Sequence, residues 1–208
     1  MTDEHPVILI IDEDPSMRAT LAEVMRSVGL AVQTFASAQD FLGSKLPDAP
    51  ACLVLDVHLS GQSVLDLHST LAESGIELPV VFISGHGDVQ MSVRAMKAGA
   101  VDFLAKPFRD QDLLDAVHQG IERDRLRRAR AVKVAKLHER YRLLTERERE
   151  IVALVVLGHP NKQIADKLAL AEVAVKAHRR QIMHKMRARS LPELVRMAGR
   201  LRGAPDQH

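Results

Sequence analysis

Cysteine and aromatic residues are scarce in this chain of 208 residues, which has no tryptophan, one tyrosine and one cysteine. With a single thiol, Cys52, no disulfide can form within the chain, and we expect a reducing compartment. Cys52 lies in the apolar run CLVLD. Burial in such a run raises a thiol pKa and hides the sulfur, so Cys52 is not expected to act as a nucleophile.

Long apolar runs are absent as well. No run approaches the roughly 20 residues of a membrane span, and the N-terminal MTDEHP lacks the basic start and apolar core of a signal peptide. We therefore expect a cytoplasmic protein with no membrane contact. Internal repeats and Cys/His pairs at zinc spacing are missing too, which disfavours a repeat array or a zinc module.

Charge is divided unequally along the chain. Residues 1–120 contain 7 Lys and Arg against 17 Asp and Glu, and the remaining residues contain 22 against 10. This asymmetry predicts two domains with different partners, and a polyanion is the expected partner of the second.

The first half alternates between two patterns. Short apolar runs (VILII, AVQTF, CLVL, PVVFIS and VDFLA) alternate with helical patterns at about 16–28, 37–44, 62–73, 88–98 and 110–120. The runs are continuously apolar, which is typical of strands covered on both faces. We predict an α/β domain over 1–120, with a doubly wound five-stranded parallel sheet whose functional residues lie beyond the carboxyl ends of the strands.

The second half is expected to be helical. The segment 121–143 has no Gly or Pro and should continue the preceding helix as a linker. Its apolar residues Val134, Leu137, Tyr141 and Leu144 fit either a short coiled coil or docking on the next domain. Capping boxes at Thr145–Glu148 and Ser190–Glu193 begin two of four short helices in an all-α domain over 144–208.

Polar residues gather at the predicted strand ends. Asp12 and Glu13 follow the first strand and Asp56 follows the third, and these two strands are neighbours in a doubly wound sheet. Carboxylates held so close repel one another and favour a hard cation such as Mg²⁺, which retains positions for water or phosphate oxygens.

Two further strand ends add to this site. Lys106 supplies a positive charge and the Ser84 hydroxyl can donate to a phosphate oxygen. Taken singly, each could be only an ion pair or a strand-end cap. Together, the carboxylate nucleophile, metal, cation and hydroxyl are the parts that phosphoryl transfer requires.

The motifs IIDEDPSMR, CLVLDVHLSG, VFISGHGD and AMKAGAVDFLAKPF resemble the receiver domain of two-component response regulators of the FixJ type. The resemblance implies a flavodoxin-like sheet of order 2-1-3-4-5 and phosphorylation of Asp56 by a sensor histidine kinase. It also implies that Glu13, Asp56, the His58 carbonyl and, through water, Asp12 bind Mg²⁺. Lys106 would pair with the phosphate, Ser84 and Phe103 would switch, and the bond before Pro107 would be cis.

This sequence departs from the family pattern at Ser60 and Val64, where Pro and Gly are usual, so the phosphate lifetime could differ. Two alternatives remain at this stage. IIDEDP and FISG also fit a haloacid dehalogenase-type phosphohydrolase, with Asp12 as nucleophile and Asp14 as acid/base. A receiver that acts without being phosphorylated is the third reading, against which the intact set of acids, Ser84 and Lys106 argues.

A basic helix is expected over 172–186. At 100° per residue, Val175, Ile182 and Met186 share one face, while Lys176, Ala177 and Arg180 gather opposite. This pattern suits a helix in the major groove of double-stranded DNA, although a solvated basic helix would look the same.

The segment from 144 to 198 resembles the LuxR-type helix-turn-helix, which implies that Lys176, Ala177 and Arg180 face base edges. Candidate phosphate contacts are Asn161, Lys162, Gln163, His178 and Arg179. Ala169 and Ala171 stand where a turn Gly and a Ser or Thr cap are usual, which should weaken local stability. We therefore expect a transcription factor that dimerises through 88–120 on phosphorylation, binds paired half-sites and contacts RNA polymerase.

Overall fold

The computed structural model describes residues 5–58, 71, 75–85 and 89–202. The chain divides into two compact units, Met1–Arg128 and Ala129–His208. Within the described part of the chain, no helix is both long enough and apolar enough to cross a membrane. The predicted domain boundaries at 120 and 143 stay a prediction.

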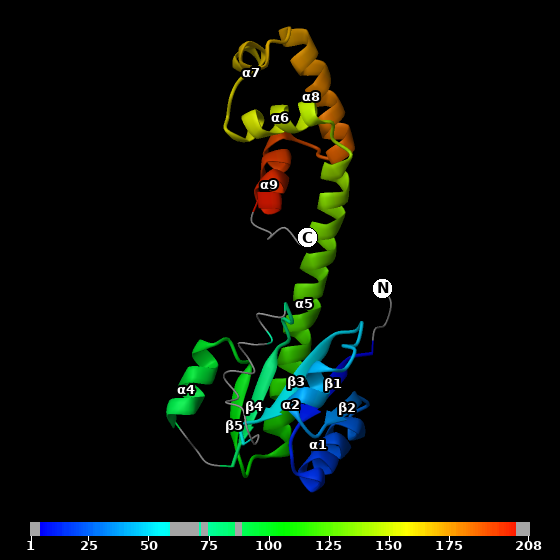
Figure 1. The fold of residues 1–208 in the computed structure, drawn as a ribbon, viewed down its shortest axis with the longest axis vertical. Helices are drawn as coiled ribbons and strands as arrows, with labels where there is room; N and C mark the ends of the chain where they lie inside the picture. Colours follow the sequence, from blue (N-terminus) through cyan, green and yellow to red (C-terminus); the bar gives the residue numbers. More distant parts are fainter. Residues whose placement is uncertain (1–4, 59–70, 72–74, 86–88, 203–208) are drawn as a thin grey trace. The chain divides into compact units, whose positions relative to one another are not determined.

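The first unit is built on a parallel sheet of order β2-β1-β3-β4-β5 (Figure 1). Its strands are β1 (Val7–Ile11), β2 (Ala31–Phe35), β3 (Ala51–Asp56), β4 (Val80–Ser84) and β5 (Asp102–Ala105). Every residue of β3 and β4 is buried. This burial explains the continuously apolar runs, and the predicted sheet and strand order are confirmed.

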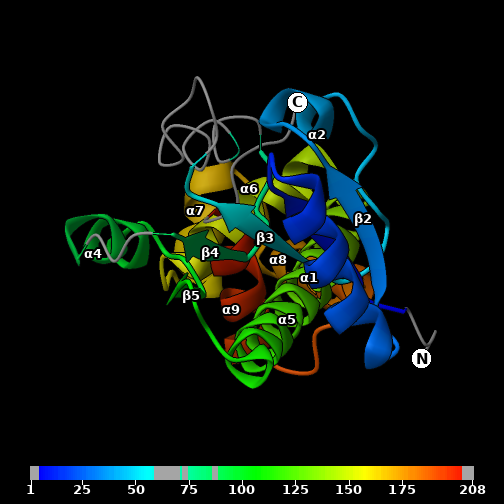
Figure 2. The same ribbon diagram turned by 90° about the horizontal axis from the view of Figure 1, so that it is seen from below.

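Side chains alternate between the two faces of the sheet. Ile8, Cys52 and Val81 pack in a core with α1 (Pro15–Ser27) and the start of α5 (Asp110–Arg142). Leu9, Leu53 and Phe82 pack in a second core with α2 (Ala38–Leu42) and α4 (Val89–Lys97). Figure 2 shows α1 and α5 on the opposite side of the sheet from α2. The predicted helix at 62–73 falls, except for Leu71, outside the described residues.

The helix expected to continue through 121–143 is present, because α5 runs unbroken for 33 residues, while its role as a linker stays a prediction. Its distal half carries the apolar set predicted to form a coiled coil or to dock. Leu137 and Leu144 are buried in the core of the second unit and Tyr141 packs against it. The docking alternative therefore holds within that unit.

The second unit contains the four short helices predicted from the sequence. They are α6 (Glu146–Val156), α7 (Asn161–Leu168), α8 (Glu172–Met186) and α9 (Leu191–Arg202). Ile151, Ile164, Val175 and Ile182 are fully buried in their shared core. Thr145 and Glu148 form the predicted capping box. At α9 the box differs, because the Glu193 carboxylate accepts from the amide of Arg189 rather than from that of Ser190.

The turn between α7 and α8 contains a strained residue. Ala169 has φ 50° and ψ 51°, in the left-handed region. A side chain with Cβ crowds the backbone there, at a cost of roughly 1 kcal/mol. Ala171 ends the turn without any side-chain hydrogen bond to the first amides of α8. The two departures noted in the sequence thus fall at the positions where glycine and a capping hydroxyl would stabilise the turn.

Ala169→Gly should stabilise the second unit by about 0.5–1 kcal/mol, since glycine adopts a positive φ without the steric cost. Tyr141 is the only tyrosine and there is no tryptophan. Its fluorescence during urea unfolding therefore reports this unit alone, and the midpoint should rise at constant slope. Ala174→Gly, inside α8, should lower the midpoint. An unchanged or lower midpoint for Ala169→Gly would contradict the assigned strain.

Candidate functional site

Three side chains meet at the carboxyl edge of the sheet. β1 and β3 pair with Ile11 opposite Leu55, so Asp12 and Asp56 follow at neighbouring positions. Lys106 Nζ lies 2.5 Å from Asp56 Oδ2 and 3.4 Å from Asp12 Oδ2. The backbone also contributes, because the His58 amide donates to Asp56 Oδ1 at 2.8 Å and the Asp14 amide donates to Asp12 Oδ1 at 2.8 Å.

The pKa values of the Asp12 and Asp56 carboxyl groups shift in opposite directions. Burial alone would raise the pKa of Asp56, but hydrogen bonds from the His58 amide and Lys106 hold it below its ordinary value. Burial, together with the nearby Asp56, raises the pKa of Asp12. Partial burial opposes the charge of Lys106, yet the bond to Asp56 raises its pKa. Asp56 is thus the carboxylate that is best stabilised in its ionised, nucleophilic form.

The remaining predicted residues lie on the adjoining strand ends. Ser84 is buried and pairs with Ala105 in the sheet register, one residue before Lys106. Phe103 on β5 is half-buried against the second core. The Lys106–Pro107 peptide bond is cis, as the resemblance implied. Glu13 and His58 are exposed beside Asp12 and Asp56. Ser60 and Val64 lie outside the described residues.

Two neighbours of the acidic pair have defined structural positions. Asp14 caps α1 by accepting from the Ser16 amide at 2.8 Å, which leaves it in a structural position rather than that of an acid/base for Asp12. Arg18 Nη1 donates to the carbonyl oxygens of Asp12 at 2.6 Å and Glu13 at 3.0 Å. The sequence reading missed Arg18. Its position one turn after the start of α1 at Pro15 was the available signal.

The donor set suits a hard divalent cation. Among the residues that the structure describes, no three His, Cys, Asp or Glu side chains converge in a metal-binding group. However, Mg²⁺ is commonly held by one or two carboxylates and completes its shell with water and phosphate oxygens. The adjacent Asp12 and Asp56 carboxylates fit that mode of binding, and burial, with a smaller contribution from Asp56, raises the pKa of Asp12.

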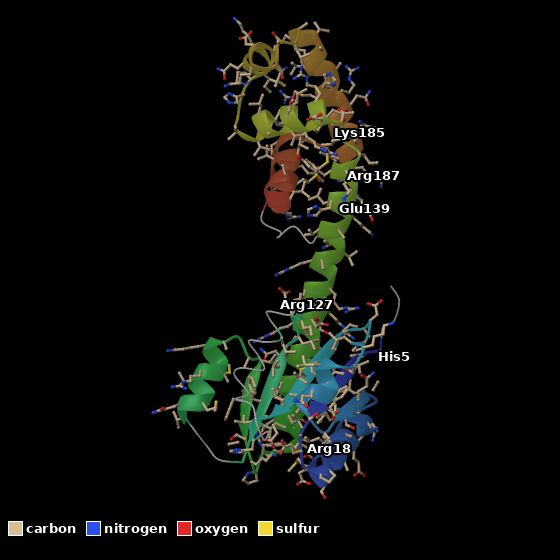
Figure 3. All side chains as sticks on the ribbon, in the orientation of Figure 1. His5, Arg18, Arg127, Glu139, Lys185 and Arg187 are labelled. Carbon is tan, nitrogen blue, oxygen red and sulfur yellow. The ribbon has the colours of Figure 1, made fainter. Side chains whose placement is uncertain are left out.

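The basic helix α8 has the two faces expected from the sequence. Val175, Ile182 and Met186 are buried in the core of the second unit. Lys176, Ala177 and Arg180 are exposed, as a surface for base contacts requires. Figure 3 shows α8 with its side chains, among which Lys185 is labelled.

The candidate phosphate contacts lie on α7 and α8. Lys162 and Gln163 are exposed, whereas Asn161, His178 and Arg179 are half-buried. Arg179 donates to the Asn161 side chain, which joins the two helices, and Gln163 contacts His159 at 2.9 Å. Of the α8 cations, Lys176 is already paired with Glu172 at 3.0 Å. Asn161 and Arg179 therefore also hold the helix-turn-helix together.

A buried ion pair orients α8 on α6. Lys185 donates to Glu148 at 2.6 Å, and the Glu148 side chain is only 5% exposed. Glu148 also accepts from the Thr145 amide in the capping box. The sequence reading identified Glu148 only as a cap. Its second partner could not be found from local spacing, because Lys185 is 37 residues away.

Two family models match the chain. The family model described as the response regulator receiver domain matches residues 8–118. The model of bacterial regulatory proteins of the luxR family matches residues 142–198. The two models thus cover both units.

Relatives align along nearly the whole chain. Nodulation protein W of Bradyrhizobium diazoefficiens is 52% identical over 192 residues, which cover 92% of this chain and 85% of that protein. Transcriptional regulatory protein FixJ of Rhizobium meliloti is 40% identical, with 95% and 96% covered. The solved structure of response regulator StyR has a TM-score of 0.79 and 42% identity, covering 94% of this chain and 98% of that one.

The chain belongs to the two-component response regulators of the FixJ type, in which a receiver domain precedes a LuxR-type helix-turn-helix. It is a phosphorylation-controlled, DNA-binding transcription regulator. A sensor kinase and DNA are its partners, and receiver domains generally use Mg²⁺ for phosphorylation. The phosphohydrolase alternative is therefore set aside.

Glu148→Gln should destabilise the second unit by about 1–2 kcal/mol at neutral pH, because it removes a charged partner of Lys185. Burial alone would raise the pKa of Glu148, but Lys185 and the Thr145 amide hold it below its ordinary value. A depressed folded-state pKa stabilises the fold above the unfolded-state pKa, and this stability is lost as pH falls through the folded-state pKa.

The Tyr141 unfolding midpoint should therefore fall less steeply with acid in Glu148→Gln than in the wild type. The exposed Glu150→Gln, on the same helix, serves as the matched control. Equal acid sensitivity in Glu148→Gln and the wild type would show that the pair does not carry this pH dependence.

Proposed function

We propose that Asp56 is the residue that accepts a phosphoryl group from the phosphohistidine of a sensor kinase. The observation that carries this assignment is the contact of Asp56 with both Lys106 and the His58 amide, which keeps its carboxylate ionised. One Asp56 oxygen attacks phosphorus while the imidazole nitrogen of the donor leaves with its bonding pair. The product is an acyl phosphate and an unmodified histidine.

The surrounding residues would stabilise the charge that this transfer brings. Asp12, Glu13, Asp56 and the His58 carbonyl would hold Mg²⁺, which neutralises charge on the transferring phosphoryl oxygens. Lys106 would pair with one phosphoryl oxygen and the Ser84 hydroxyl would donate to another. Beyond its own phosphorylation and slow dephosphorylation, no enzymatic activity is assigned to the chain.

We infer that Ser84 and Phe103 change position on phosphorylation and thereby alter a dimer surface within 88–120. Support comes from α4, where Val89, Val93 and Met96 are exposed at 74%, 47% and 46%. Apolar side chains at this spacing form one stripe on a helix and favour burial against a partner. A two-state receiver in which phosphorylation favours the dimer would place two LuxR-type domains on paired half-sites.

The DNA contacts follow from the exposed face of α8. Lys176, Ala177 and Arg180 would read base edges in the major groove. Contacts to the DNA backbone would come from Asn161, Lys162, Gln163, His178 and Arg179. On DNA in the cytoplasm, the regulator would then contact RNA polymerase.

Acetyl phosphate or phosphoramidate with Mg²⁺ should raise the affinity of the wild-type protein for a palindromic site, and sedimentation should show a dimer. Asp56→Asn should show neither change, because an amide cannot form the acyl phosphate. The test is the dissociation constant, with and without phosphodonor, at one fixed salt concentration. Asp14→Asn, which alters the α1 cap, serves as the matched acidic control.

An equal gain in Asp56→Asn would show that phosphorylation at this residue does not control DNA binding. Absence of a gain in both proteins would instead favour a receiver that acts without phosphorylation.

Arg180→Ala should weaken binding to the specific site by about 1–3 kcal/mol and relax base preference at one position. Lys162→Ala should weaken binding to all sequences alike and reduce the slope of log affinity against log salt by about 1. The measurements are affinities for single-base variants of the site over a salt series. A uniform loss with Arg180→Ala would reassign that residue to the DNA backbone.

A further inference from the structure

One buried carboxylate of the first unit lies at the opposite end of the sheet from the acidic pair. Asp124 on α5 is 0% exposed, at the opposite end of β3 from Asp56. Its Oδ2 accepts from the amide of Ala51, the first residue of β3, at 3.0 Å. Its Oδ1 accepts from Arg127 Nε at 2.8 Å and Nη2 at 2.7 Å. Both oxygens are thus satisfied, as a buried carboxylate requires.

The helix approaches the strand closely just before Asp124. A Cβ on Gly120 would lie 2.4 Å from Cys52 Sγ, so only glycine lets α5 contact β3 at this point. Val117 and Ile121 are buried on the same helical face, and Asp124 continues that stripe by one turn. Residues 129–133 are all exposed. Asp124 is therefore the last buried residue of α5 within the first unit.

Two arginines extend this attachment to the loops that precede β3 and β4. Arg128 pairs with Asp48 at 2.5 Å and Arg127 lies 3.9 Å from Glu77. Asp48 and Glu77 are largely exposed, and exposed ion pairs contribute little to stability. Because Asp124 is the buried acid among these contacts, it contributes most to holding α5 on the first unit. Figure 3 labels Arg127 and Arg18 at opposite ends of the first unit. Arg18 donates to the Asp12 carbonyl oxygen, at the end of the sheet that carries the acidic pair.

We propose that Asp124 is a positioning residue that fastens the linker helix to the amino ends of the central strands and converts phosphorylation of Asp56 into movement of α5. This inference rests on the proposed function of Asp56. Helix α5 begins four residues after Lys106. A change around Lys106 displaces the start of α5, and a fixed point at Asp124 turns that displacement into a tilt of the linker instead of letting the helix slide.

The test compares Asp124→Asn with the wild type in the full chain. Ala51 and Arg127 donate to different oxygens of Asp124, and Asp124→Asn replaces one of these oxygens with an NH2 donor, so one of the two contacts is lost. Arg130→Gln is the matched control, because Arg130 is exposed on the same helix. Three quantities are measured: the extent of phosphorylation by acetyl phosphate, the ratio of DNA affinities with and without phosphate, and hydrogen exchange of the Ala51 amide.

Asp124→Asn should be phosphorylated as fully as the wild type. Its affinity ratio should fall to within about twofold of unity, whereas allosteric couplings commonly reach about 5–150-fold. Exchange at Ala51 should accelerate. Arg130→Gln should match the wild type in all three measurements.

A wild-type affinity ratio in fully folded Asp124→Asn would overturn the proposal. A parallel loss of phosphorylation and DNA binding, in proportion to the unfolded fraction, would also overturn it, by showing a purely structural role. If Asp124→Asn does not fold, Arg127→Gln keeps the carboxylate and tests the same ratio. If the wild type shows no gain, the proposed function fails, and unchanged Ala51 exchange in the variant would separately refute the attachment.

Discussion

The repulsion between the carboxylates of Asp12 and Asp56 governs the chemistry of the receiver unit. Parallel pairing of β1 with β3 places both groups at one edge of the sheet. Lys106 offsets part of their charge through contacts at 2.5 Å and 3.4 Å. The remaining imbalance appears as opposite pKa directions, raised for Asp12 by burial and lowered for Asp56 by its hydrogen bonds. In the proposed function, a cation and a phosphoryl group would complete this balance, so one arrangement would account for both metal binding and nucleophilicity.

Strand β3 and helix α5 extend from this edge of the sheet toward the rest of the chain. Strand β3 is buried along its whole length. Asp56 lies at one end of this strand, and the hydrogen bond between Ala51 and Asp124 lies at the other. Helix α5 begins beside Lys106 and continues without interruption into the residues whose side chains enter the core of the second unit. There the Glu148–Lys185 pair fixes the recognition helix against α6. The contacts of Lys106, Asp124 and Lys185 in the proposed signalling route thus join residues that are far apart in the sequence.

The sheet and the recognition helix could be predicted because their signals are local. Continuously apolar runs marked β1, β3 and β4, and the spacing of Val175, Ile182 and Met186 marked the inner face of α8. The roles of the linker arginines could not be predicted in this way. Arg127 pairs with Asp124, and Arg128 pairs with Asp48, which is 80 residues away from it in the sequence. Only the continuation of the Val117 and Ile121 stripe to Asp124 hinted at burial there.

The central claim is tested most directly by locating the phosphoryl group itself. After incubation with acetyl phosphate, with or without Mg²⁺, borohydride reduction of the acyl phosphate leaves a stable mark that peptide mass spectrometry can map. We expect a mark on Asp56 alone, formed only when Mg²⁺ is present. A mark on Asp12, or one on Asp56 that forms equally well without the metal, would contradict it.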